Sequence, residues 1–169
     1  MALCHLKNAQ LDKSFHEYKG RVVFRGDCVK DEHGNFAVFS EQGTSASHLM
    51  AAKLVDAIAH MPGMSGEDAD AKGAYTQTDL GEDCPPTWIT LPRDRWPKSW
   101  FRKDGSCKYY QPVVRLHSNL YGHPLAGLYW ERFCQEGVEA CGFTKVKGWE
   151  CLYKHEKLGL ILSIYVDDF

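Results

Sequence analysis

The chain has 169 residues, a formal net charge of −2 at neutral pH, 44% apolar residues and 25% charged residues. These values fit one globular domain with a buried core, and they exclude a disordered or fibrous chain. No window holds the roughly 18 uninterrupted apolar residues of a membrane span, and the first residues lack the apolar stretch of a signal peptide. We therefore expect no membrane association and no targeting signal.

The seven cysteines are an odd number, and none of them forms a Cys-x-x-Cys pair. Cys134, Cys141 and Cys151 come nearest to clustering, but no histidine stands at zinc-finger spacing from them. The pattern indicates free, reduced thiols in a cytosolic or nuclear protein, and we assign no histidine to a metal.

Charge is divided unevenly along the chain. Residues 67–83 hold six acidic side chains and one base, whereas residues 93–115 hold seven bases and two acids. An acidic segment able to hold cations, followed by a basic one able to meet phosphates, suits an enzyme that acts on a polyanion. A solvated loop gives the same count of bases, so the division supports this function without deciding it.

The first third of the chain predicts two strands and a helix. The runs 21–25 and 36–39 are strand-like, with turn residues at 31–35 between them. Apolar residues at helical spacing predict a helix over 45–60, which Thr44, Ser45 or Ser47 would cap and which Pro62 and Gly63 would end.

The rest of the chain mixes short strands with one longer helix. Residues 70–80 read as a strand that runs into a short helix or turn, and a Pro-rich stretch then contains a strand at 87–91. A helix is expected from about 124 to 141. Residues 150–153 and 158–166 form an antiparallel hairpin by pattern. Strands and helices without regular β-α alternation indicate an α+β fold.

Two adjacent carboxylates, Asp167 and Asp168, follow the apolar stretch 158–164, which has the length of a buried strand. Like charges this close, at the end of a buried strand, disfavour each other's ionised form. A hard divalent cation such as Mg²⁺ removes that cost. The plainer interpretation is an exposed Asp-Asp turn between strands.

A third carboxylate, Asp70, stands at a predicted strand end, with small residues and then Tyr75 after it. Two-metal phosphoryl transfer needs carboxylates from separate elements that converge on the cations. Asp70, Asp167 and Asp168 would provide such a set. An Asp before a helix is otherwise commonly a cap.

Three segments, taken in this order, resemble the reverse transcriptase region of copia-type LTR retrotransposon Pol polyproteins. That family carries a D-V-K-N-A-F-like segment, an L-Y-G segment that opens a helix with a Trp, and then Y-V-D-D. The corresponding segments here are Asp70-Ala71-Lys72-Gly73-Ala74-Tyr75, Ser118-Asn119-Leu120-Tyr121-Gly122 with Trp130, and Tyr165-Val166-Asp167-Asp168. Lesser matches at residues 18–23 and 151–153 extend the resemblance from about residue 17 to the end.

The resemblance implies the fingers and part of the palm of a right-hand polymerase, with an antiparallel palm sheet backed by helices. Residues 1–169 would then be a single fragment of a reverse transcriptase domain. The return strand of the catalytic hairpin, the thumb, and any RNase H or integrase module would be absent after Phe169. The chain would be either a piece of a polyprotein or a decayed element.

The resemblance also assigns catalytic roles. Asp70 and Asp167 would ligate two Mg²⁺ ions, for which Mn²⁺ can substitute, and Asp168 would complete the acidic set. Tyr75 would be the steric gate that excludes a ribonucleotide's 2′-OH, although a core aromatic gives the same pattern.

Further residues would contact the substrates. Tyr165 and Val166 would touch the primer terminus and the template-paired nucleotide. Lys19 and Arg21 would meet the incoming triphosphate, with an ordinary exposed strand pair as the rival interpretation.

The L-Y-G loop departs from the family in one residue. Gly122 to Gly127 would form the loop and helix start under the nascent base pair. Leu125 takes the place where the family often has a Gln and cannot hydrogen-bond there, which leaves the role of that position open.

The function implied is RNA-directed DNA polymerase, the Mg²⁺-dependent addition of dNTPs to a primer 3′-OH on an RNA or DNA template. The compartment would be a cytoplasmic virus-like particle or the nucleus, and the oligomeric state is not indicated. The rival is a truncated, non-catalytic retroelement remnant that is inert or binds nucleic acid through its basic stretch. A metal-dependent nuclease would also use acidic clusters, but it gives no reason for Tyr75 or Tyr165.

Overall fold

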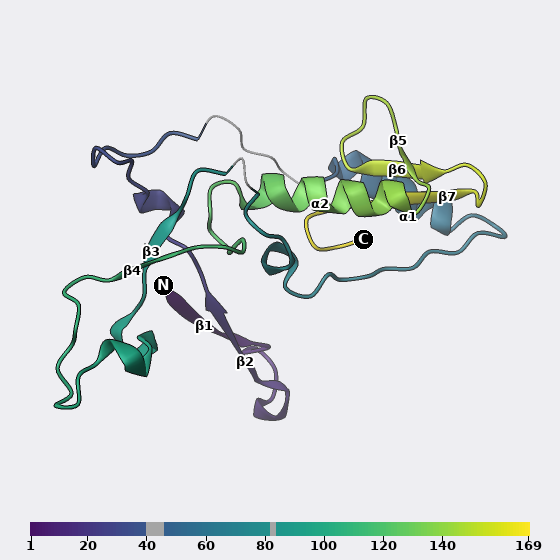
Figure 1. Ribbon diagram of the computed structural model, residues 1–169. Helices are drawn as coiled ribbons and strands as arrows, with labels where there is room; N and C mark the ends of the chain where they lie inside the picture. Colours follow the sequence, from purple (N-terminus) through teal and green to yellow (C-terminus); the bar gives the residue numbers. More distant parts are fainter. Residues whose placement is uncertain (40–45, 82–83) are drawn as a thin grey trace.

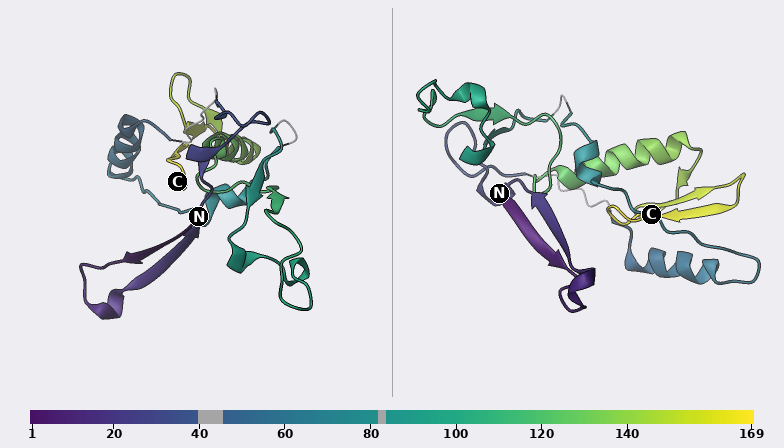
Figure 2. Two further views of the ribbon diagram at one scale, coloured as in Figure 1. Left: turned by 90° about the vertical axis from the view of Figure 1, so that its left-hand side faces the viewer. Right: turned by 90° about the horizontal axis from the view of Figure 1, so that it is seen from below.

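The computed structural model describes residues 1–39, 46–81 and 84–169. One end of the molecule has three layers, with a small antiparallel sheet between two helices (Figure 1). The sheet has the order β5-β6-β7, from Thr144–Lys145, Leu152–His155 and Leu160–Ser163. Figure 2 shows the helices α1, Leu49–Ala59, and α2, Ala126–Ala140, on opposite faces of this sheet.

The helix α2 was expected from about residue 124 to 141, and the structure confirms it within two residues. Its end is a Schellman motif: Gly142 N–H donates to the Glu139 carbonyl and Phe143 N–H to the Val138 carbonyl. Gly142 takes φ +92°, and a Cβ there would lie 2.8 Å from a ring nitrogen of His155. Both the backbone conformation and the contact with β6 therefore require glycine.

The helix α1 begins later than its expected start. His48 is the N-cap, with no side-chain capping bond. Of the three expected caps, Thr44 and Ser45 lie outside the described residues. Ser47 does not cap the helix, because its hydroxyl bonds to the Ser163 hydroxyl at 2.8 Å and its N–H donates to the Ile164 carbonyl. This serine ties the start of α1 to β7 instead.

The main core lies between α2 and the sheet. Its buried side chains are Ala74, Trp130, Cys134, Val138, Cys151, Tyr153 and Ile164. A smaller cluster of Cys84, Leu125 and Tyr129 lies at the start of α2. Burial of large apolar side chains at this interface is the main stabilising term of the fold.

The first sheet differs from its expected form. The strand β2, Glu17–Val22, pairs antiparallel with β1, Ala2–Lys7, a strand that the sequence analysis did not predict. The hairpin projects from the body (Figure 2), and eleven of its twelve strand residues are exposed. Because its two faces are nearly unburied, its residues carry no clear alternation of apolar and polar side chains, and β1 left no signal.

The run 36–39 is not a strand; it contributes one isolated bridge, between Phe36 and Lys30. The turn expected between the runs is present. The Asp31 carboxylate accepts hydrogen bonds from the backbone N–H groups of His33 and Asn35, at 2.9 and 2.8 Å. The segment is thus a side-chain-stabilised turn with too few ladder bonds for a hairpin.

The strands β3, Trp88–Thr90, and β4, Val113–Arg115, form the remaining two-stranded sheet. A long loop joins them and extends away from the three layers (Figure 1). The chain is thus of mixed α+β class, with two α-helices and small antiparallel sheets in the described part. Neither of these helices is long and apolar enough to cross a membrane.

Candidate functional site

Asp70 and Asp168 lie opposite each other in a short antiparallel ladder, although about a hundred residues separate them in sequence. Residues 69–71 pair with residues 167–169 through backbone hydrogen bonds of 2.8 and 3.1 Å at one end and 2.7 Å at the other. These bonds flank Asp70 and Asp168, which therefore form a non-hydrogen-bonded pair, the type in which facing side chains lie closest.

Residues 165–168 form a tight hairpin turn before this ladder. Tyr165 N–H donates to the Asp168 carbonyl at 2.8 Å, and Asp168 N–H donates back at 3.0 Å. Val166 takes φ +59°, a strained conformation for a β-branched residue. The Trp130 indole N–H donates to the Val166 carbonyl, so a buried side chain of α2 holds the strained turn in place.

Asp167 and Asp168 have different surroundings at this turn. Asp167 is half-buried and close enough to Tyr75 and Tyr121 to act on both phenols electrostatically. Asp168 is exposed and lines a groove beside α1.

No three His, Cys, Asp or Glu side chains within residues 1–39, 46–81 and 84–169 lie together closely enough to hold a metal ion. The structure thus brings the backbones of Asp70, Asp167 and Asp168 together without gathering their three carboxylates into one cluster. The donors still suit Mg²⁺ chemically, since carboxylate oxygens are the ligands that this ion prefers. Burial raises the pKa of the Tyr121 phenol, and the charges of Asp167 and Asp70 raise it further.

Tyr75 and Tyr121 form an edge-to-face pair, with ring centroids 4.9 Å apart. Tyr75 belongs to a short 3-10 helix, Ala74–Gln77, and packs partly against the main core. Burial raises the pKa of both phenols, and Asp167 raises them further. Tyr75 therefore packs against the core and also lies within electrostatic reach of Asp167.

Arg21 connects the projecting hairpin to this pair. Its guanidinium carbon lies 5.9 Å from the centroid of the Tyr121 ring, within cation–π range. Lys19 is two residues earlier on β2, so its side chain leaves the same face of the strand. Both cations are exposed. They therefore stand on the side of the hairpin that faces Tyr121.

The loop after Tyr121 holds the base of the hairpin against the body. Phe24 N–H donates to the Tyr121 carbonyl at 2.7 Å. Gly122 takes φ +85°, and a Cβ there would lie 2.3 Å from the Phe24 carbonyl oxygen. Gly127 lies in the first turn of α2. Leu125, whose role the sequence left open, is buried in the smaller core cluster.

His123 is a buried residue that the sequence analysis did not single out. Its ring packs against Phe24, and its Nδ1 accepts the Leu125 N–H at 3.3 Å. Its Nε2 therefore carries the proton and donates to the Thr87 hydroxyl at 3.4 Å. Burial lowers the pKa of His123, in keeping with a neutral ring that fastens this loop to the segment before β3.

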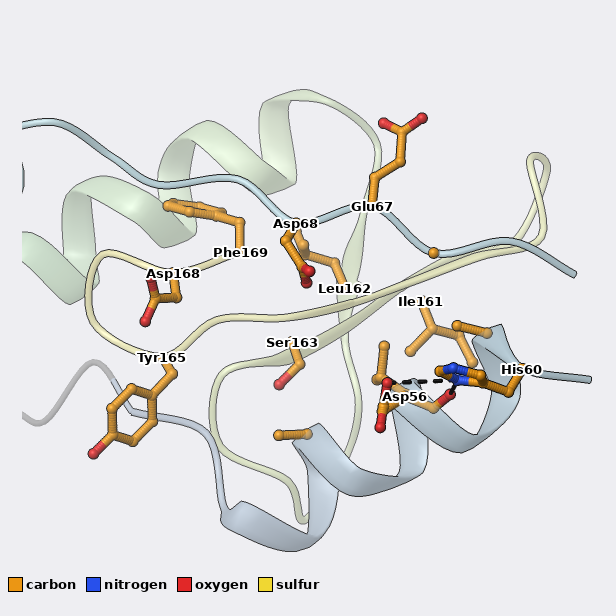
Figure 3. Close-up of a pocket in the computed structure, with 14 residues that line it drawn as sticks. Asp56, His60, Glu67, Asp68, Ile161, Leu162, Ser163, Tyr165, Asp168 and Phe169 are labelled. Carbon is orange, nitrogen blue, oxygen red and sulfur yellow. Dashed lines mark hydrogen bonds and ion pairs between the residues drawn. The ribbon is translucent and has the colours of Figure 1, made fainter. Parts of the chain in front are cut away.

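Figure 3 shows the groove on the Asp168 side of the ladder. It has a volume of about 430 Å³ and lies between α1, β7 and residues 66–68. Tyr165 and Asp168 line one end (Figure 3), and Asp56, Glu67 and Asp68 add further acidic side chains. The lining therefore combines acidic side chains with apolar side chains from α1 and β7.

Tyr121 and Trp130 are the site residues whose roles the sequence did not reveal. Both belong to the L-Y-G segment and the Trp that follows it, so the motif marked their positions. What each does depends on its spatial neighbours: Tyr121 joins Arg21 to Tyr75, and Trp130 holds the turn at Val166.

Part of the chain is similar to retrotransposon polyproteins of yeast. It is 33% identical over 57 residues to the transposon Ty1-DR4 Gag-Pol polyprotein of Saccharomyces cerevisiae. The same identity over the same length relates it to the Ty1-DR6 and TyH3 Gag-Pol polyproteins. The similarity covers 33% of this chain and spans 3% of each polyprotein. No protein-family model and no solved structure matches the chain.

Proposed function

We propose that the chain is the nucleotide-adding part of an RNA-directed DNA polymerase, which extends a primer 3′-OH with dNTPs on an RNA or DNA template. The observation that carries the proposal is the pairing of residues 69–71 with residues 167–169, which sets Asp70 beside the Asp167-Asp168 turn. The partial similarity to Ty1 Gag-Pol polyproteins supports a retrotransposon origin.

In this proposal Asp70 and Asp167 would hold Mg²⁺ on the side of Tyr121, where both carboxylates act. When bound, the ion supplies positive charge that neutralises the triphosphate and favours the attacking oxyanion. Asp168 lies opposite Asp70 in the ladder, lines the groove and would complete the acidic set. The chain's own contribution is to fix two strand segments so that these carboxylates stay near one another.

The neighbouring side chains would position the nucleotide. Tyr75 is braced by the edge of Tyr121, so its ring is a rigid wall against a ribose 2′-OH. Lys19 and Arg21 are exposed cations on the facing side of β2 and would meet phosphates. Exclusion by a braced ring needs no hydrogen bond and acts through volume alone.

The turn and the following loop would contact the primer and the base pair. Tyr165 is exposed at the turn, and Val166 is held beside it by Trp130. Gly122 and Gly127 would form the loop and helix start under the new base pair, and Gly122 lets the Phe24 carbonyl pack against this loop. The strained turn supplies a fixed edge for the primer terminus.

A second candidate is nucleic-acid binding without catalysis. It is favoured by the absence of a three-carboxylate cluster in the described part of the chain. Positioning to within about 0.5 Å is what catalytic constellations need. A chain whose carboxylates stay apart would bind primer and template without extending the primer.

Metal binding separates these candidates. We expect Mn²⁺, a paramagnetic stand-in for Mg²⁺, to broaden the NMR signals of the Ala71 and Asp167 amides. Asp167→Asn keeps the shape of the side chain but removes its charge, and should abolish that broadening. Asp12→Asn, an exposed aspartate in another turn, is the matched control. Equal broadening in Asp167→Asn would exclude Asp167 as a ligand.

Primer extension tests the reaction itself. Oligo(dT) on poly(rA), with Mg²⁺ and dTTP, should be extended by a longer polypeptide read from the same frame, and little by the 169-residue chain. In the extending polypeptide, Tyr75→Val should raise UTP incorporation far more than it lowers dTTP incorporation. If both rates fall together with stability, Tyr75 is a core residue and the gate is wrong.

A further inference from the structure

The loop between β3 and β4 is a small folded unit with its own aromatic centre. The Trp96 ring packs against Trp100 and Phe101, at centroid distances of 5.7 and 6.2 Å. Its indole N–H donates to the Leu91 carbonyl at 2.9 Å. Tyr109 closes the cluster with an edge-to-face contact to Trp100 at 5.9 Å. These contacts order a loop that projects away from the main core (Figure 1).

The far part of the loop is a hairpin. Lys108 N–H donates to the Trp100 carbonyl and Arg102 N–H donates to the Ser106 carbonyl, both at 2.8 Å. The Asp104 carboxylate accepts bonds from the N–H and hydroxyl of Ser106, at 2.9 and 2.7 Å, which lowers the pKa of Asp104. One of the two acids of the loop is therefore engaged in its own turn.

Residues 91–110 carry six cations against two acids, in a chain whose net charge is −2. The other acid, Asp94, pairs with Arg95 at 3.3 Å. The remaining five cations contact no carboxylate in the described part of the chain, and the three of them that form side-chain hydrogen bonds donate to neutral acceptors. These cations are Arg93, Lys98, Arg102, Lys103 and Lys108. Their charge is left for an external anion.

Two exposed aromatic residues, Tyr109 and Tyr110, follow Lys108 directly in the sequence. Tyr109 rests on Trp100 and is still 53% exposed, whereas Tyr110 is 91% exposed. An exposed ring gains nothing from packing in the free protein. In a loop whose cations lack carboxylate partners, such a ring is suited to stack on a ligand that also carries negative charge.

We propose that residues 91–110 form a binding surface for single-stranded nucleic acid, with bases stacked on Tyr110 and Tyr109 and phosphates held by the unpaired cations. Aromatic rings and cations in alternation are the combination that binds single strands without sequence preference. A duplex keeps its bases stacked internally, so it offers phosphates alone. The surface is separate from the Asp70–Asp168 ladder and needs neither metal nor nucleotide.

The stacking arm is tested with the full 169-residue chain in EDTA, using fluorescence anisotropy of labelled oligo(dT) and oligo(rU) 20-mers. Tyr110→Ala should weaken binding about fivefold or more, the effect of losing one base stack. Phe15→Ala removes another exposed ring, 61% exposed and outside the loop, and should leave the affinity unchanged. An equal affinity for Tyr110→Ala and wild type, with folding verified by circular dichroism, would overturn the proposal.

The phosphate arm is measured as the salt dependence of the same binding. Each phosphate contact on a single strand contributes about 0.7 to the slope of log affinity against log salt. Lys98→Ala with Lys103→Ala should therefore reduce the slope by about 1.4. Lys13→Ala with Lys157→Ala removes two exposed lysines elsewhere and should leave it unchanged.

The choice of probe decides the class of partner. Binding to 20-mer duplex at the affinity of the single strands, or binding to poly-glutamate as tightly, would refute a single-strand surface. A preference for one 20-mer over the other assigns the surface to RNA or to DNA. The binding experiments contain EDTA, which removes Mg²⁺, so they do not depend on polymerase activity. Oligonucleotide binding together with a failure of primer extension would reject the polymerase proposal and leave the single-strand surface standing.

Discussion

The three-layer body and the two projecting segments of this protein are stabilised by different interactions. In the body, Trp130, Tyr153 and Ile164 are almost wholly buried between α2 and the sheet. In the β1–β2 hairpin eleven of twelve strand residues are exposed, and the β3–β4 loop has only its own aromatic cluster. Burial of apolar side chains stabilises the body, whereas local hydrogen bonds and a few ring contacts stabilise the projecting segments.

The candidate site lies where these two kinds of structure meet. Its carboxylates stand on the ladder that α2 supports through Trp130, and its cations stand on the exposed hairpin. Rigid placement suits groups that must hold a geometry, and exposure suits groups that must meet an incoming anion. The difference implies that damage to the body should be large and global, and damage to the projecting segments small and local.

The largest effect is expected for Trp130→Ala. The ring is only 2% exposed and its N–H donates to the Val166 carbonyl. Removing the ring leaves a cavity, so the free energy of unfolding should fall by about 3–5 kcal/mol. Trp88→Ala, a tryptophan of β3 that is 59% exposed, should lower it by less than about 0.5 kcal/mol. Urea denaturation measures both. Similar losses for the two would contradict the distinction between body and projecting segments.

A smaller effect is expected where the hairpin joins the body. Gly105→Ala meets no neighbouring atom and has only the left-handed backbone penalty, about 1–2 kcal/mol. Gly122→Ala has the same penalty and also displaces the Phe24 carbonyl, so the loss should be roughly twice as large. Limited proteolysis should then cut the β1–β2 hairpin faster in Gly122→Ala only. Equal stability of the two variants would show that the Phe24 contact yields freely.

His123 should give the junction a mild pH dependence. Its folded pKa is lowered, so the unfolded chain takes up the proton first as pH falls. Stability is therefore full above the unfolded pKa, near 6.5, and declines as pH drops below it. His123→Asn keeps an acceptor for the Leu125 N–H and removes the titration. Melting temperatures at pH 7.5 and 5.5 should differ more in wild type than in this variant.

The smallest effect on stability is expected at Asp27. The hydrogen bond from Arg25, followed by that from the Cys28 thiol, lowers the pKa of Asp27 to about 2. Stability linked to this pair is present above the unfolded pKa and is lost as pH falls toward 2. Because both side chains are more than half exposed, solvent screens the pair and Arg25→Gln should leave the melting curve at pH 7 unchanged. An NMR titration should nonetheless show the pKa of Asp27 rising.

The sequence predicted the body well, because buried elements carry periodic patterns. The helix over α2, the hairpin of β6 and β7 and the strand around β3 all appear near their expected positions. The sequence did not predict β1, and its prediction of a strand at 36–39 was wrong. Both segments are largely exposed, so neither face is selected for apolar residues and the pattern carries little information. Ser47 looked like a cap, and only its neighbour Ser163 shows why it is not one.

The candidate site was predictable in its membership more than in its arrangement. Pattern and resemblance selected Asp70, Asp167 and Asp168, and the structure places their backbones together. Asp167 and Asp168 have different surroundings because the chain turns tightly at Val166. The sequence did not predict that turn, since β-branched residues rarely adopt a left-handed backbone conformation. The catalytic and binding roles assigned to these residues stay predictions until the metal and primer experiments are done.

The ladder between residues 69–71 and 167–169 also bears on how the chain reaches its folded state. Closing a loop of about a hundred residues costs more conformational entropy than forming a hairpin between neighbouring segments. Contacts between residues so far apart in sequence also slow folding. The β1–β2 and β6–β7 pairs can form from their own neighbourhoods, whereas the Asp70–Asp168 pair waits for α2 and the sheet to dock. In refolding followed by hydrogen-exchange labelling, the Ala71 and Phe169 amides should gain protection after those of β6.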